Sequence, residues 1–94
     1  MITKYPTYTF NNSRTYTLKQ NVSHIFTARS YGQYIVAYVF KYDAETAVRM
    51  DIISKSDDFD TYATITLSTD NSKTITLTSK SSNFWFITNM ISLG

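Results

Sequence analysis

The chain has 94 residues, of which 43% are hydrophobic, 16% aromatic and 17% charged. This length suits one domain, and the aromatic content excludes an intrinsically disordered protein. The net charge of +2 arises from nine basic and seven acidic residues that form no run, which argues against a nucleic-acid or anionic-membrane partner. The absence of cysteine excludes a disulfide framework and thiolate chemistry.

Thr and Ser, with 15 and 11 copies, are the commonest residues, and together with Tyr, Phe, Val and Ile they favour strands over helices. The first 20 residues either pack on the rest of the domain or form an extended arm. Polar turn clusters divide the chain into about eight short predicted strands: Tyr5–Phe10, Tyr16–Leu18, Val22–Arg29, Tyr34–Tyr42, Val48–Ser54, Thr61–Ser68, Thr74–Ser79 and Phe84–Leu93.

The only histidine lies on one of the early strands. His24 shares a strand face with Val22, Phe26 and Ala28, because side chains two residues apart point to the same side. We therefore expect His24 to have a structural role in the interior, and we do not assign it as a general base or metal ligand.

Two strands, Tyr34–Tyr42 and Phe84–Leu93, are apolar or aromatic on both faces. Since a small sandwich buries one face of each strand, the second face needs cover from the same chain, a partner subunit or a ligand. We expect a subunit interface there, and the alternative is that several tyrosines stand in solvent. The predicted binding residues are Tyr34, Tyr38, Tyr42 and Trp85.

Charged residues occupy the middle of the chain. We expect Lys41 and Arg49 to be surface charges, and a short helix within Asp43–Met50 is a minor alternative to a turn and strand. An acidic cluster predicts a solvated turn, with a cation site as the alternative, although the glycine and the spacing of a known calcium loop are absent. The cluster consists of Asp57, Asp58 and Asp60.

The stretch TITLSTDNSKTITLTSK consists of two similar segments in succession, and we interpret it as a β-hairpin rather than a repeat array. Only the second and fourth residues of each copy are apolar, which is the period of a half-buried strand. Asn71 tolerates the left-handed backbone of a tight turn. Antiparallel pairing centred on Asn71 gives two apolar pairs on one face, Leu67–Ile75 and Ile65–Leu77.

The scarcity of glycine favours a sandwich over a barrel, because small barrels turn their corners with glycines and bulges and this chain has only Gly32 and Gly94. We predict an all-β fold, an antiparallel and jelly-roll-like β-sandwich that comprises residues 1–94 as one domain. The sequence gives no phosphate-binding loop, and we assign no catalytic residue, cofactor or metal ligand.

The order of the segments resembles the C-terminal tip and head-binding domains of tailed-phage fibre and baseplate proteins. The resemblance covers roughly residues 22–94: an aromatic strand (YIVAYVFKY), a charged strand (VRMDII), the Thr-rich hairpin and a terminal aromatic strand (NFWFITNMISL). It implies a small jelly-roll-like sandwich that assembles as a trimer and binds host surface glycans or neighbouring virion proteins. It carries no diagnostic motif.

We therefore expect a non-enzymatic viral structural or adhesion module, a homo-oligomer in which a trimer is favoured. One alternative is a carbohydrate-binding module in which Trp85, Tyr38 and Tyr34 stack on sugar rings. Another is a small viral inhibitor of a host defence protein, with the acidic turn imitating a polyanion. The first residues lack a signal peptide, and no apolar stretch is long enough to span a membrane, so we expect the protein in a virion or a host cytoplasm.

Overall fold

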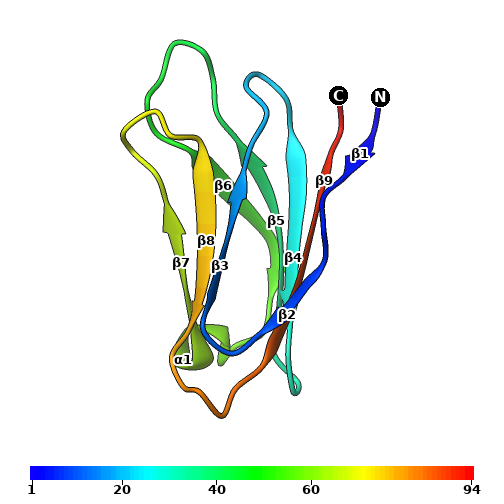
Figure 1. Ribbon diagram of the computed structural model, residues 1–94, viewed down its shortest axis with the longest axis vertical. Helices are drawn as coiled ribbons and strands as arrows, with labels where there is room; N and C mark the ends of the chain where they lie inside the picture. The colour runs from blue at the N-terminus through cyan, green and yellow to red at the C-terminus, as the bar shows by residue number, and fades with distance from the viewer.

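The computed structural model describes residues 1–94 and has two antiparallel sheets packed against each other, which confirms the predicted all-β sandwich (Figure 1). The small sheet has the order β3 (Ser13–Thr17), β8 (Thr74–Ser79) and β7 (Ala63–Leu67). The large sheet has six strands, with β2 (Tyr8–Phe10) beside β9 and the order β1 (Thr3–Lys4), β9 (Phe86–Ser92), β4 (His24–Arg29), β5 (Tyr34–Phe40) and β6 (Arg49–Lys55).

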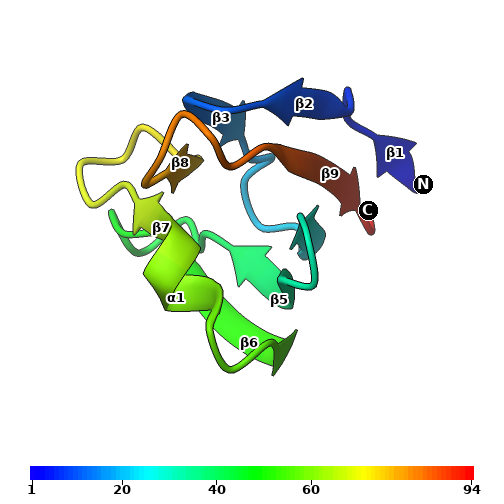
Figure 2. The ribbon, with the colours of Figure 1, turned by 90° about the horizontal axis from the view of Figure 1, so that it is seen from below.

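The connections make the sandwich jelly-roll-like, because the chain passes between the two sheets four times. It crosses before and after β3, between β6 and β7, and between β8 and β9 (Figure 2). Hairpins join β4 to β5, β5 to β6 and β7 to β8 within a sheet. The single helix, α1 (Phe59–Tyr62), has four residues, and the structure contains no helix that is long and apolar enough to cross a membrane.

The predicted hairpin is confirmed in its register. Leu67 pairs with Ile75 and Ile65 pairs with Leu77 across β7 and β8. Asn71 has a φ of 72°, the left-handed conformation that asparagine tolerates better than most residues. Ile75 and Leu77 of β8 are fully buried, whereas their partners Leu67 and Ile65 are half-buried because β7 is an edge strand of the small sheet.

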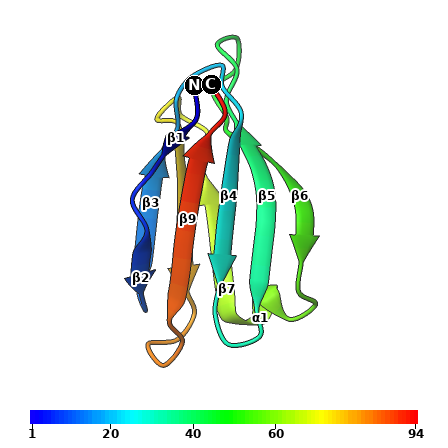
Figure 3. The same ribbon diagram turned by 90° about the vertical axis from the view of Figure 1, so that its right-hand side faces the viewer.

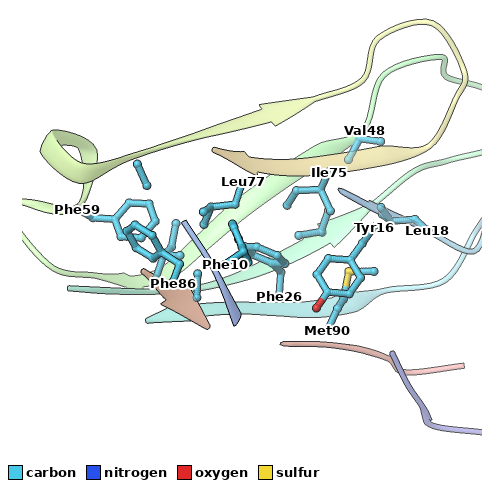
Figure 4. Close-up of a cluster of buried hydrophobic side chains, with 14 residues drawn as sticks. Phe10, Tyr16, Leu18, Phe26, Val48, Phe59, Ile75, Leu77, Phe86 and Met90 are labelled. Carbon is cyan, nitrogen blue, oxygen red and sulfur yellow. The ribbon is translucent and has the colours of Figure 1, made fainter. Parts of the chain in front are cut away.

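A cluster of 14 buried residues fills the space between the sheets (Figure 4). At one end, the rings of Phe59 and Phe86 meet edge to face with centroids 5.9 Å apart. Towards the other end, Tyr16 is buried and its hydroxyl group donates to the carbonyl oxygen of Pro6 at 2.6 Å and lies 3.0 Å from that of Thr88. A fully buried aromatic or aliphatic side chain stabilises such a fold by roughly 2 kcal/mol.

Several predicted boundaries need correction. The predicted strand Tyr5–Phe10 is shortened to β2, which begins at Tyr8, and β1 precedes it at Thr3–Lys4; Pro6 lies between the two strands and has no N–H to donate to β9. The predicted strand at Thr61 begins instead at Ala63, after α1. The segment Asp43–Met50 contains no helix and consists of turns before β6 begins at Arg49.

The first 20 residues lie against their own chain. β1 and β2 pair with β9 in the large sheet, and β3 pairs with β8 in the small sheet. After β3, the N–H of Leu18 donates to the carbonyl oxygen of Lys73 at 2.7 Å, and the chain then returns to the large sheet. These residues therefore contribute an edge strand to each sheet.

Candidate binding face

One face of the large sheet is turned away from the core and is rich in aromatic residues. The alternation of β5 buries Ile35, Ala37 and Val39 almost completely between the sheets. No other segment of the chain crosses the opposite face (Figure 3). The four predicted binding residues have these exposed fractions: Tyr34 44%, Tyr38 42%, Tyr42 53% and Trp85 47%.

The strand register aligns a row of side chains across this outer face. Tyr38 lies opposite Ile25 of β4, and Ile25 lies opposite Ile91 of β9. The row ends in opposite charges, because Ile91 pairs with Lys4 on one side and Tyr38 pairs with Asp51 on the other. The only two ion pairs of the protein are Arg49–Glu45 and Lys55–Asp60. The charges at the two ends of the row, Lys4 and Asp51, are therefore unpaired.

A hollow of about 460 Å³ lies at the end of this face where both chain termini are found (Figure 3). It brings together Tyr38, Tyr42 and Asp51. Lys41 also lines it, but the expectation that Lys41 is a surface charge is wrong, because its exposed fraction is 1%. The residue continues the inward alternation of β5, and its Nζ donates to the carbonyl oxygen of Tyr42 at 3.1 Å.

A second hollow, of about 430 Å³, lies at the opposite end of the sandwich, beside the β4–β5 turn. Trp85, Tyr31 and Arg29 line it. The binding residues predicted from the sequence include Trp85 but neither Tyr31 nor Arg29. The juxtaposition follows from the register, in which Arg29 lies opposite Ile87 on the strand that Trp85 precedes.

The remaining predicted binding residue, Tyr34, lines neither hollow. It is opposite Arg29 on the neighbouring strand, and its hydroxyl oxygen accepts a hydrogen bond from Ser54 at 3.4 Å. The structure therefore places all four predicted residues on or beside one face, but brings only Tyr38 and Tyr42 into the same hollow.

The acidic cluster lies elsewhere, at the end of the sandwich beside α1. Its three members, Asp57, Asp58 and Asp60, are exposed. Asp60 accepts a hydrogen bond from Lys55 Nζ at 2.8 Å in an ion pair. The structure has no group of three or more His, Cys, Asp or Glu side chains that are placed to hold a metal ion.

His24 is fully buried, as predicted. Its Nε2 accepts the backbone N–H of Lys19 at 3.1 Å and lies 3.3 Å from the hydroxyl group of Tyr5. Nδ1 is buried without a hydrogen-bond partner. Burial lowers the pKa of His24 from its usual value, because the interior disfavours the charged imidazolium. The ring is therefore a neutral part of the interior and is out of reach of a ligand.

Comparison with known proteins gives no relative. No protein-family model, no curated protein and no solved structure matches this chain. The geometry of the outer face is therefore the basis for a functional proposal.

Proposed function

We propose that this protein is a non-enzymatic structural and adhesion module of the viral type, a homo-oligomer that assembles through the outer face of its large sheet. The observation that carries the proposal is the set of half-exposed aromatic side chains on a sheet face that no segment of the chain covers. Contiguous apolar surface on a small domain is typical of an interaction site.

The charge pattern of the row favours a second copy of the chain as the occupant. The row reads Lys4, Ile91, Ile25, Tyr38 and Asp51 from one edge to the other. If two copies pack face to face about a twofold axis parallel to the strands, Lys4 of each copy faces Asp51 of the other. Such a contact is self-complementary, as a twofold interface requires. The resemblance to fibre tips favours a trimer, and the row supports a twofold pair.

The apolar centre of the row suits the core of such an interface. Ile91 and Ile25 are half-buried already and Tyr38 follows them in the row, so packing a second sheet on this row removes apolar surface from water. Tyrosine is enriched in interface cores because its ring buries a large area and its hydroxyl group retains a polar contact. Charges at the rim of such an interface then determine how the two copies are oriented more than how tightly they associate.

The solution mass of the wild type, measured by light scattering on a sizing column, tests this proposal. One chain has a mass of 10.8 kDa, and we expect at least twice that value at micromolar concentration. Tyr38→Ala removes the only aromatic ring of the row and should shift the mass towards one chain. Tyr31→Ala is the matched control, because it makes the same change at a turn outside the row. A wild-type protein that remains monomeric at millimolar concentration would contradict the proposed assembly.

Carbohydrate binding is a second candidate function, and the hollow beside Trp85 favours it. An exposed indole next to polar groups is suited to stacking on a sugar ring. This hollow lies away from the central row, so the two functions are compatible on one molecule.

A further inference from the structure

We propose that the hollow formed by Trp85, Tyr31 and Arg29 binds an acidic sugar, a pyranose ring that carries a carboxylate. This ligand class makes the proposed adhesion role more specific, and in that respect the inference rests on the proposed function. The hollow measures about 430 Å³, which lies within the range of small-molecule sites. Thr9, Ser30 and Ile87 complete its lining.

Two kinds of contact hold the segments that carry the aromatic walls of the hollow. The hydroxyl group of Ser30 donates to the carbonyl oxygen of Trp85, which joins the β4–β5 turn to the segment before β9. Tyr31 packs edge to face against Phe84, with ring centroids 5.9 Å apart. Phe84 in turn stacks on Tyr62 at 4.2 Å. The ring of Tyr31 and the backbone at Trp85 are thus held beside the hollow before a ligand arrives, which lowers the entropic cost of binding.

Arg29 supplies the charge that selects the ligand. It lies on the outer face between Ile87 and Tyr34, and neither of the two ion pairs of the protein involves it. No acidic residue lines the hollow. A guanidinium group that has no carboxylate partner and lies beside aromatic rings is suited to a planar anion, which it binds through two parallel hydrogen bonds.

A carboxylated pyranose satisfies both features at once. Its ring carbons present an apolar patch to Trp85 or Tyr31, and its carboxylate reaches Arg29. The hydroxyl group of Thr9 can donate to or accept from a sugar hydroxyl, and that of Ser30, which donates to Trp85, can accept from one. A neutral sugar leaves the guanidinium group without a partner, and a simple carboxylate leaves the rings uncovered. The hollow also lies at the end of the sandwich remote from both termini, so it stays accessible when either terminus carries a tag (Figure 3).

The experiment titrates the full chain with glucuronic acid and with glucose, which differ only at C6, where glucuronic acid has a carboxylate and glucose has a hydroxymethyl group. Trp85 is the only tryptophan, so its fluorescence emission reports on this hollow directly. Saturation-transfer NMR of the sugar detects binding independently of that emission. We expect glucuronic acid to bind about tenfold or more tightly than glucose, as a charge-assisted hydrogen-bonded contact implies. The preference should weaken at high salt.

Arg29→Gln should reduce the affinity for glucuronic acid to that for glucose. Arg14→Gln is the matched control, because it removes the same charge from β3 of the small sheet, where the guanidinium group lies 5.2 Å from the Tyr8 ring. The proposal is overturned if both methods detect no binding of either sugar. It is also overturned if the two sugars bind equally tightly, or if Arg29→Gln still prefers glucuronic acid. A monomeric protein that still prefers glucuronic acid would contradict the assembly and leave this site intact.

Discussion

At the scale of single residues, His24 makes stability depend on pH. Its pKa in the folded protein is lowered by burial, whereas the unfolded chain titrates near the usual 6.5. The unfolded state therefore binds more protons below that pH, and the free energy of unfolding decreases as the pH falls through 6.5 towards the lower folded pKa. The slope is at most about 1.4 kcal/mol per pH unit.

Urea denaturation between about pH 7 and pH 5 measures this slope. His24→Gln should remove it, because glutamine retains an acceptor for the Lys19 N–H but does not titrate. Asp70, whose pKa is lowered from 3.8 by hydrogen bonds from Ser72, acts only at more acidic pH. A wild-type stability that is flat over this range would contradict the buried, neutral state of His24.

Tyr16 joins the N-terminal segment to the interior of the large sheet. Its hydroxyl group contacts the carbonyl oxygens of Pro6 and Thr88, so Tyr16→Phe leaves one part-buried and one buried acceptor without this donor. We expect a loss of about 1–3 kcal/mol in the free energy of unfolding. Tyr42→Phe removes a hydroxyl group from an exposed ring and should change the stability by less than about 0.5 kcal/mol. Equal effects of the two substitutions would argue against the Tyr16 contacts.

At the scale of elements, the turn of the β7–β8 hairpin depends on Asn71. Because its φ is 72°, Asn71→Ala should destabilise the protein by about 1 kcal/mol, whereas Asn71→Gly should be nearly neutral. Chemical denaturation of the two variants and the wild type measures the difference. If the alanine variant is as stable as the glycine variant, the turn does not require a left-handed residue.

The sequence was sufficient to predict this hairpin because period-two alternation and a central Asn fix both the register and the turn. The sequence was insufficient to predict α1, because this helix places Phe59 against Phe86. That contact joins segments that are far apart in the chain. The inward position of Lys41 was missed for a similar reason: the alternation of β5 continues past the strand, although lysine normally favours the surface.

At the scale of the whole molecule, the sequence predicted two sheets and a second apolar face on two strands, but not the two hollows at the ends of this face. The hollow at Trp85 depends on the β4–β9 register and on the approach of the β4–β5 turn, neither of which is a local property of the sequence. Tyr31 and Arg29 therefore become candidate ligand-binding residues only in the folded chain.

The self-complementary row makes a prediction about assembly that a charge exchange tests. Asp51→Lys places Lys4 of one copy opposite a lysine of the other, twice in each pair, and should weaken association about tenfold at low salt. Adding Lys4→Asp restores opposite charges and should recover most of the affinity. Analytical ultracentrifugation of the single and double variants measures the effect. A double variant that is weaker than Asp51→Lys alone would contradict the twofold arrangement.

The most direct test of the central claim, that the outer face of the large sheet is buried by a second copy, is hydroxyl-radical footprinting of the wild type at concentrations below and above assembly. Tyr38 is half-exposed on that face, and Tyr31 lies outside the row as an internal reference. The account predicts that oxidation of Tyr38 slows several-fold on assembly while that of Tyr31 does not change. Equal oxidation of Tyr38 at all concentrations, in a protein whose mass increases, would place the interface elsewhere.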